Sequence, residues 1–439
     1  MKIMLVMPQP ELKKTIFDKL MFPSLTLKQI AAITPRNHFI KLIDERYENI
    51  NFNEKFDLIG ISITTYSALR GYRIADTFRK KGIPVVFGGY HASLLPEEAK
   101  KHADSVVIGE AEYTWPQLLK DLEIGKLKKF YYNKQVVKPS EIPPARHDIG
   151  SYTPFQEPIQ ASRGCPVGCE FCSMNIIEGN TFRGRPIDKI IEELKSIKTK
   201  QIFFVDASLT TNPTYSKQLF KSMKEINKTV KCFGNIHVFS NDDKFLQLAS
   251  EAGITRWYIG IESISQLNID QVGKGTNKVK NYVKAIKNIK DHGMMVTGFF
   301  MFGFDNDTID IFNKTLKFIN NLNLDSVAFS ALTPFPGTKL AERLENEGRI
   351  LTKDWSRYNE AIVNIKPSQI TEEELYTGIN NLAREYFSYI NILRRNIQGL
   401  TTKDKFKLKH YLKNLIENVV KRSFYFNDKL RLQSPAFNQ

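Results

Sequence analysis

The chain has 439 residues, of which 42% are hydrophobic and 25% are charged. These proportions are typical of soluble globular proteins and exclude a disordered or collagen-like chain. A chain of this length is expected to form two or three domains, each with its own core. No apolar run reaches the roughly 18 residues that a membrane-spanning helix needs. The N-terminus lacks an apolar signal region with a cleavage site, so we expect a cytoplasmic protein.

The formal net charge is +16, and most of the excess is spread along the chain as lysine. We therefore expect no nucleic-acid partner. The densest basic stretch is the C-terminal tail, where polar and apolar residues alternate and a solvated amphipathic helix is predicted. Its basic residues are Lys403, Lys405, Lys407, Lys409, Lys413, Lys421 and Arg422. Two interpretations stay open: an ordinary solvated surface, or peripheral contact with a lipid or another anionic partner.

Residues 1–137 alternate between short β-branched runs and helical segments. Strands are predicted at residues 2–7, 39–44, 58–63, 84–89 and 105–109, and helices at 68–81 and 96–102. This alternation favours an α/β domain with a doubly wound, Rossmann-like parallel sheet. Ligands on such sheets bind beyond the carboxyl ends of the strands.

A proline-rich segment, residues 138–157, predicts a linker between this domain and a second set of strand–helix repeats. Strands are predicted at residues 158–163, 201–206, 231–237, 257–262, 295–302 and 326–332. Helices are predicted between them, at residues 187–197, 216–226, 242–252, 278–291 and 308–321. Six repeats favour a partial (βα)6 barrel over residues 158–365, with its site at the carboxyl ends of the strands. Residues 366–439 are polar and form a predicted helical region, with a helix start in residues 368–374, where acidic residues would lie in the first turn.

Three of the four cysteines fall within eight residues, at Cys165, Cys169 and Cys172, directly after the first strand of the predicted barrel. Three thiolates can ligate three irons of a [4Fe–4S] cluster and leave the fourth iron open to a small molecule. A zinc site would need a fourth ligand nearby, and a plain ferredoxin would need a fourth cysteine; neither is present in this stretch. Cys232 lies alone in an apolar stretch and is predicted to be a buried core thiol.

Residues 162–166 (Ser-Arg-Gly-Cys-Pro) together with Phe171 and Cys172 resemble the signature of the radical S-adenosylmethionine (SAM) superfamily. Residues 205–208, 259–263, 298–304 and 332–338 resemble that superfamily's segments on the second, fourth, fifth and sixth strands. The resemblance implies a cluster on the three cysteines and a set of SAM-binding residues. These are Phe171, Asp206, Glu262, Ser263 and Gly303.

The same resemblance implies the chemistry. The reduced cluster gives one electron to SAM, and a 5′-deoxyadenosyl radical then removes hydrogen from an unactivated carbon. A reducing partner of the flavodoxin or ferredoxin type is implied as well. No individual catalytic side chain is predicted from the sequence.

A doubly wound domain ahead of such a barrel is similar to the cobalamin-binding branch of the superfamily. The loops after three strands resemble those that surround cobalamin in that branch. The implied contacts are Ser62, Thr64, Thr65, Gly88, Gly89, His91, Gly109 and Glu110. The Asp-x-His-x-x-Gly motif that ligates cobalt is absent after the first strand, so the front domain is either a cobalamin site with no histidine on cobalt or a scaffold. Methylthiotransferases are excluded, because residues 1–164 contain no cysteine.

The resemblance thus implies a cobalamin-dependent C-methyltransferase that acts through the 5′-deoxyadenosyl radical and methylcobalamin. Two alternatives remain: cyclisation or rearrangement with the same cofactors, and a cobalamin or Fe–S sensor without turnover. The intact SAM-facing segments on strands four to six argue against a sensor. The expected substrate is a small molecule or a lipid, because the C-terminal region loosely resembles hopanoid-modifying enzymes.

Overall fold

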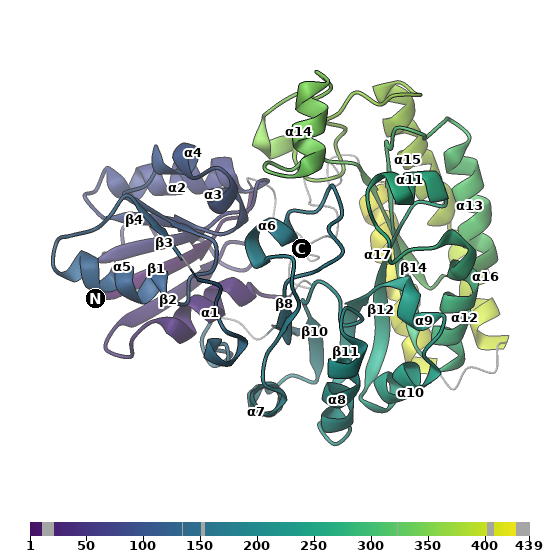
Figure 1. Ribbon diagram of the computed structural model, residues 1–439, viewed down its shortest axis with the longest axis horizontal. Coiled ribbons are helices and arrows are strands. Elements are labelled where there is room, and N and C mark those ends of the chain that lie inside the picture. The colour runs from purple at the N-terminus through teal and green to yellow at the C-terminus, as the bar shows by residue number, and fades with distance from the viewer. Residues whose placement is uncertain (11–21, 134, 151–153, 323, 402–407, 427–439) are drawn as a thin grey trace. The chain divides into compact units, whose positions relative to one another are not determined.

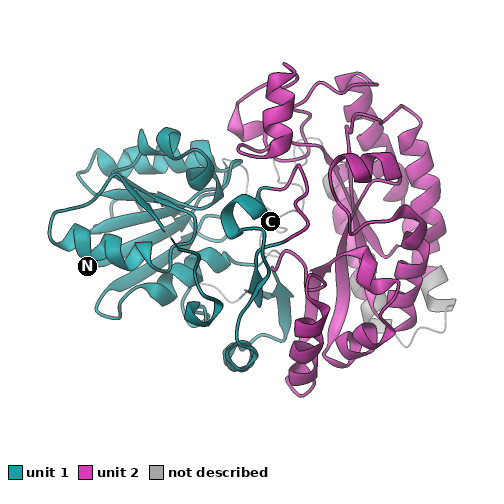
Figure 2. Ribbon diagram, viewed as in Figure 1, with its two compact units in different colours: residues 1–165, 173–205 teal, residues 166–172, 206–439 magenta. Residues whose placement is uncertain are grey.

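The computed structural model describes residues 1–10, 22–133, 135–150, 154–322, 324–401 and 408–426 (Figure 1). The chain divides into two compact units (Figure 2). Unit 1 comprises Met1–Cys165 and Ser173–Val205, and unit 2 comprises Pro166–Cys172 and Asp206–Gln439. These units do not coincide with the four predicted segments: the described part of the predicted linker and the first barrel strands belong to unit 1.

Unit 1 contains a six-stranded parallel sheet in the order β2-β1-β3-β4-β5-β6. The strands are β1 (Lys2–Met7), β2 (Phe39–Asp44), β3 (Leu58–Ser62), β4 (Val85–Gly88), β5 (Ser105–Ile108) and β6 (Phe130–Tyr132). Five of these match the predicted strands to within a residue at either end. The edge strand β6 was not predicted, because three residues carry too little periodicity to be recognised.

Helices cover both faces of this sheet, as the doubly wound prediction requires (Figure 1). They are α1 (Leu25–Ile33), α2 (Ala68–Arg79), α3 (Tyr90–Leu94), α4 (Pro96–Lys100) and α5 (Thr114–Glu123). Leu27 of α1 and Trp115 of α5 share one apolar cluster with Leu5 and Val86 of the sheet. The indole nitrogen of Trp115 donates to Oγ1 of Thr34 over 2.9 Å, so this buried polar atom is satisfied.

The second sheet has six strands in the order β14-β13-β12-β11-β10-β7, all parallel where their register is defined. They are β7 (Glu157–Ile159), β10 (Gln201–Phe204), β11 (Thr229–Gly234), β12 (Ile254–Glu262), β13 (Met295–Phe302) and β14 (Ser326–Ala331). The intervening helices include α7 (Ile187–Ser196), α8 (Pro213–Met223), α10 (Asp243–Glu251), α12 (Tyr282–Asp291) and α13 (Ile311–Leu322). The predicted alternation of strands and helices is confirmed.

Two of the strand predictions are wrong in part. The segment 158–163 is not one strand: β7 ends at Ile159, and Ser162–Arg163 form β8, which pairs antiparallel with β9 (Arg183–Gly184). The segment 231–237 also runs too far, because β11 ends at Gly234 and His237 lies in the short helix α9 (Ile236–Phe239). In both cases the apolar pattern continues past the end of the strand into the following buried turn.

Residues of β12 alternate between the two faces of the second sheet. Trp257 packs against Phe220, Phe239 and Phe245 of α8, α9 and α10, so it marks the helix-covered face. Its neighbours Arg256 and Tyr258 therefore lie on the opposite face, which is called the inner face below.

The C-terminal region is helical, as predicted. It contains α15 (Glu372–Tyr386), α16 (Tyr389–Thr401) and α17 (Leu408–Tyr425). Thr371 and Glu374 form a capping box at the start of α15, in the place where the sequence indicated a helix start. Among the described helices, none is both long enough and apolar enough to span a bilayer.

Helix α17 is not the solvated helix that the tail pattern predicted. Lys421 is buried and donates to Oγ of Ser326 over 2.8 Å, and Asn414 accepts from Arg256 on the inner face over 2.9 Å. Lys403, Lys405 and Lys407 lie outside the described residues. The prediction failed for Lys421 because a lysine can be buried where fixed oxygen atoms receive its ammonium group.

Candidate functional site

Backbone hydrogen bonds within each unit hold the residues of the cysteine loop that belong to that unit. In unit 1, the Cys165 amide donates to the carbonyl of Gly179 over 3.2 Å. Gly164 has φ +79°, and a Cβ there would lie 2.1 Å from the Thr181 carbonyl oxygen, so the position requires glycine. In unit 2, the Glu170 amide donates to the Val272 carbonyl over 3.0 Å, which anchors the segment of the loop that carries Cys169 and Cys172.

The three loop thiols are half-buried and form no disulfide. Thiols of this kind, once deprotonated, are the ligands that iron–sulfur clusters use, so the donor set fits a cluster. The described residues contain no ready-made group of three or more His, Cys, Asp or Glu side chains in metal-binding geometry. Cys232, in contrast, is fully buried, and its burial raises the pKa of its thiol well above the usual value. The prediction of a core thiol at this position is confirmed.

Phe171, the aromatic residue before the last cysteine, packs on an apolar cluster of unit 2. That cluster includes Val272, Phe304 and Leu332. The Glu170 carboxylate accepts from Nε of Arg343 over 2.6 Å. The segment between Cys169 and Cys172 is thus fixed on one side by packing and on the other by an ion pair.

Glu262 and Ser263 lie where β12 ends, and both are buried. Glu262 has φ +62°, an uncommon conformation for a residue with a side chain. Its carboxylate forms a close ion pair with the ammonium group of Lys274, which is buried too. Burial disfavours the charge of Lys274, but Glu262, together with the nearby Cys169 and Cys172, outweighs this effect and raises the pKa of the lysine. Lys274 was not predicted, because it comes 12 positions after Glu262 in the sequence.

A second network connects the end of β12 to the turn after β13. The side-chain nitrogen Nδ2 of Asn268 donates to Oγ of Ser263 over 3.2 Å and to Oδ1 of Asp307 over 2.7 Å. The other oxygen of Asp307 accepts from the backbone amides of Gly303 and Phe304 over 2.9 and 3.1 Å. Burial raises the pKa of Asp307 to about 6. This network brings the predicted residues Ser263 and Gly303 together through two residues that sequence reasoning missed.

Asp206, the remaining residue predicted to face SAM, is the first residue of the second segment of unit 2 and is 1% exposed. Its negative charge is a lesser cause of the raised pKa of Cys232. Cys232 lies in β11, so both residues belong to unit 2.

The predicted cobalamin contacts lie in unit 1, at or just beyond the carboxyl ends of β3, β4 and β5. Ser62 ends β3, and the Thr64 amide donates to Oγ of Ser67 over 3.0 Å in the turn that leads into α2. Gly89 has φ +89°, and a Cβ at this position would lie 2.7 Å from Oγ of Ser62. The Ile63 amide donates to the Gly88 carbonyl over 2.9 Å, which links the ends of β3 and β4, and Thr65 is buried.

Gly88 and Gly109 leave room above the same edge of the sheet. A Cβ added to Gly109 would meet no atom within 4 Å, and one added to Gly88 would reach only Val107, at 4.0 Å. Gly109 also has φ +76°, and its amide donates to Oγ of Ser93 over 2.9 Å. Bare backbone beside open space at two adjacent strand ends fits a bulky ligand that approaches the sheet closely.

His91 and Glu110 have protein partners in this structure. The imidazole of His91 is fully buried, with Nε2 3.0 Å from the Tyr72 hydroxyl and 3.4 Å from the Glu98 carboxylate. Glu110 accepts from Arg163 over 2.6 Å and from Arg183 over 3.0 Å. Both side chains therefore stabilise unit 1 itself, and their predicted contact with cobalamin stays a prediction.

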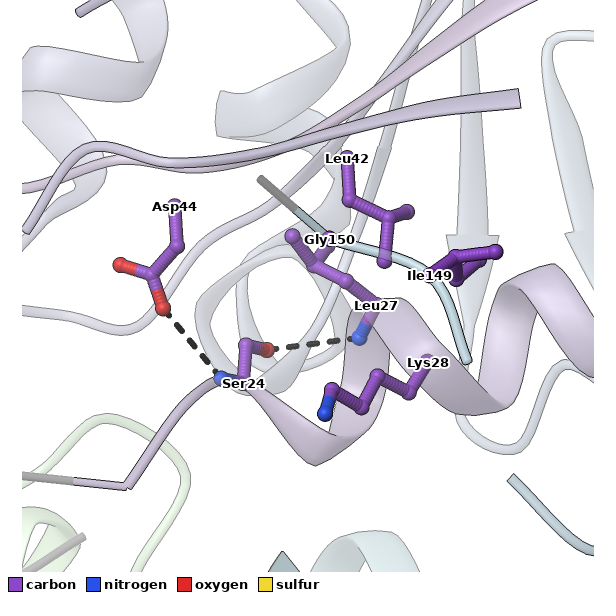
Figure 3. A pocket seen from close by; sticks show the side chains of 7 residues that line it. All are labelled: Ser24, Leu27, Lys28, Leu42, Asp44, Ile149 and Gly150. Carbon is purple, nitrogen blue, oxygen red and sulfur yellow. Dashed lines mark hydrogen bonds between the residues drawn. The ribbon is translucent and has the colours of Figure 1, made fainter. Parts of the chain in front are cut away.

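A small cavity in unit 1 is separate from these strand ends (Figure 3). It measures about 10 Å³, which is room for a single water molecule. Leu27, Lys28, Leu42, Ile149 and Gly150 line it, with Ser24 and Asp44, whose Oδ2 accepts from the Ser24 amide over 3.2 Å. The cavity is too small for SAM or cobalamin.

Comparison with known proteins gives matches to both parts of the chain. Residues 159–319 match the radical SAM superfamily, and residues 38–119 match the B12 binding domain. A bacteriochlorophyllide d C-8(2)-methyltransferase of Chlorobaculum tepidum is 31% identical over 78% of this chain and 80% of its own length. The bacteriochlorophyllide d C-12(1)-methyltransferase of the same organism is 29% identical over 91% of this chain and 90% of its own.

The solved structures agree on the fold. The radical SAM methyltransferase TsrM from Kitasatospora setae, with cobalamin and a [4Fe–4S] cluster bound, superposes with a TM-score of 0.72. The match covers 96% of this chain and 99% of TsrM at 14% identity. With the cysteine loop, the strand-end glycines and both family matches in place, the chain belongs to the B12-binding radical SAM superfamily and is a cobalamin-dependent radical SAM methyltransferase.

Proposed function

We propose that this enzyme methylates an unactivated carbon of a flat, conjugated ring system of the bacteriochlorophyllide kind. The observation that carries the proposal is a group of three aromatic side chains on the inner face of unit 2. Phe233, Tyr258 and Phe299 come from the adjacent strands β11, β12 and β13. Their ring centres are 5.7, 5.9 and 6.1 Å apart. Phe233 and Tyr258 are only half-buried, so an aromatic surface remains open to a planar ligand.

Two further features support this substrate class. The relatives that act on bacteriochlorophyllide match most of the chain, including the strands that carry the three rings. The inner face below the rings is closed: Arg256 precedes Tyr258 by two residues and binds both Thr297 and Asn414 of α17. A substrate on the rings would therefore rest on a closed surface that limits the access of water from that side.

The cofactors, when bound, supply a radical that can take hydrogen from an unactivated carbon and a cobalt-bound carrier for the methyl group. The protein's own groups hold and orient them. We propose that Cys165, Cys169 and Cys172 hold the cluster and that Glu262 and Ser263 bind SAM, with Lys274 fixing the Glu262 carboxylate. The electron would come from a flavodoxin- or ferredoxin-type donor in the cytoplasm.

The test uses anaerobically purified full-length protein, reconstituted with iron, sulfide and hydroxocobalamin. Bacteriochlorophyllide and SAM with a deuterated methyl group are added under reduction, and the products are identified by mass spectrometry. We expect a labelled methyl group in the pigment, together with 5′-deoxyadenosine and S-adenosylhomocysteine. A product without the label and without S-adenosylhomocysteine would instead support cyclisation or rearrangement. Methylation of a lipid such as a hopanoid, with none of the pigment, would overturn the ring proposal.

A variant separates the role of the rings from general damage. Phe233→Leu is expected to raise the KM for the pigment by about two- to tenfold, because one aromatic contact contributes about 0.5–1.5 kcal/mol. Formation of 5′-deoxyadenosine without substrate should persist in this variant. Phe155→Leu, which changes an exposed ring of unit 1, is the matched control and should leave KM unchanged.

A further inference from the structure

Helix α17 buries a polar face on the inside of unit 2. Asn414, Asn418 and Lys421 are buried, and their spacing of four and three residues places them on one side of the helix. Asn418 donates to the carbonyl of Asp325 over 3.0 Å, and Lys421 donates to Ser326. These three residues cover the backbone at the start of β14 through hydrogen bonds, while the buried Tyr425 at the end of the helix packs on the rings of Phe329 and Phe387.

The opposite side of α17 is apolar and exposed. Leu412 and Ile416 each precede a buried asparagine by two residues, which turns them roughly 200° away from it at 100° per residue. Both side chains are more than half exposed. The helix is therefore inverted relative to an ordinary surface helix, in which the apolar face is the buried one.

Helix α16 adds a second exposed apolar stripe. Ile390, Leu393 and Ile397 recur at three- and four-residue spacing and are 80%, 53% and 60% exposed. Ile392 and Arg395, on the other side of the helix, are buried. An apolar stripe of this kind in a soluble monomer commonly marks a surface that binds a partner.

The two helices that carry these stripes pack against each other. The Arg422 guanidinium near the end of α17 lies 4.0 Å from the ring centre of Tyr389 at the start of α16, so the helices are antiparallel. Residues that follow Tyr389 in α16 therefore run alongside residues that precede Arg422 in α17. Ile390, Leu393, Ile397, Leu412 and Ile416 are called the C-terminal apolar face below.

The charge of this region identifies the partner. Residues 389–425 contain nine lysines and arginines, of which Arg395 and Lys421 are buried, against Asp404 and Glu417 as acids. An apolar helical face in a strongly basic segment is the pattern of helices that lie in the surface of an anionic membrane. A second copy of the chain would bring the same excess of positive charge against itself, which opposes association. We propose that the C-terminal apolar face binds the surface of a bilayer that contains anionic lipids.

The experiment measures co-sedimentation of the full-length protein with vesicles. One set contains phosphatidylcholine and phosphatidylglycerol, and the other contains phosphatidylcholine alone. The variant carries Ile390→Gln, Leu393→Gln and Ile397→Gln, since glutamine keeps a good helix propensity. The control carries Ile124→Gln and Val283→Gln, which are equally exposed apolar residues outside the C-terminal helices. Far-UV circular dichroism and thermal unfolding verify that both variants fold.

We expect wild type and control to bind the anionic vesicles and to release them at high salt, because ions screen the basic residues. The variant should bind at least about tenfold more weakly, since each removed side chain would bury its apolar surface in the bilayer. Equal binding by variant and wild type, or no binding by wild type, would overturn the proposal. The proposal would also be overturned if light scattering showed a dimer of the wild type that the same three substitutions dissociate. The assay contains no substrate, so its outcome is independent of the proposed methylation.

Discussion

Asn268 donates a hydrogen bond of 2.7 Å to Asp307, and this one contact joins helix α11 (Gln266–Gln271), which follows β12, to the turn that follows β13. Asn268 also reaches Ser263 after β12, while Asp307 receives the amides of Gly303 and Phe304 after β13. The two predicted SAM-binding segments are thus fixed relative to each other by side chains that need not touch SAM. Such supporting contacts are what hold a binding site in a precise geometry.

Asp307→Asn should alter the pH dependence of stability. Burial raises the pKa of Asp307 to about 6 in the folded protein, above its ordinary value of 3.8. The folded state therefore holds this proton more tightly than the unfolded state, and wild type loses stability as pH rises from about 4 to 6. The neutral asparagine lacks this loss. Relative to wild type, the variant should gain roughly 3 kcal/mol across that range, as measured by urea unfolding at a series of pH values. A difference that stays constant with pH would contradict the shifted pKa.

Lys274→Met should strongly destabilise unit 2. The substitution leaves the buried Glu262 carboxylate without its ion-pair partner, which typically costs about 3–5 kcal/mol. Glu262→Gln removes the same interaction from the other side. The double variant should be less destabilised than the two single losses added together, because both act on one contact. Chemical denaturation of wild type, the two single variants and the double variant measures this coupling. If the losses of unfolding free energy in the single variants add up to the loss in the double variant, the pair is not coupled.

The four cysteines should differ in reactivity toward iodoacetamide. Cys165, Cys169 and Cys172 are half-buried and should be alkylated in the protein without its cluster. Cys232 should resist until the protein unfolds, because it is fully buried and its pKa is raised, and only the thiolate reacts. Peptide mass spectrometry before and after denaturant reads this out. Reconstitution with iron and sulfide should protect the three loop cysteines and leave Cys232 unchanged.

Asn418→Ala tests whether α17 is part of the folded unit. The side chain is buried and donates to the carbonyls of Asp325 and Asn414 over 3.0 and 2.8 Å. Its loss should cost about 1–3 kcal/mol, because a buried carbonyl loses its partner. Ser423→Ala, at an exposed position on the same helix, is the control and should change stability by less than about 0.5 kcal/mol. Thermal unfolding compares the two, and equal effects would mean that α17 contributes little to the stability of unit 2.

The sequence alone determined the class of fold and predicted the three cysteines as ligands of the cluster. Two kinds of local pattern made this possible: the short apolar runs that form strands such as β1, β2 and β13, and the spacing of the three cysteines. They are set by interactions between residues close in the chain or by the reach of one loop. For the same reason the segments that are predicted to face SAM could be recognised as short motifs.

Only the tertiary structure decided which distant residues meet. The pairing of Lys274 with Glu262, the contact between Asn268 and Asp307, and the aromatic group on three strands each depend on strand register and loop path. The burial of Lys421 and the exposure of Ile416 reverse what their polarity suggests. Polarity predicts the side that a helix buries only when apolar packing dominates the interface, and on α17 hydrogen bonds to the edge of β14 decide it instead.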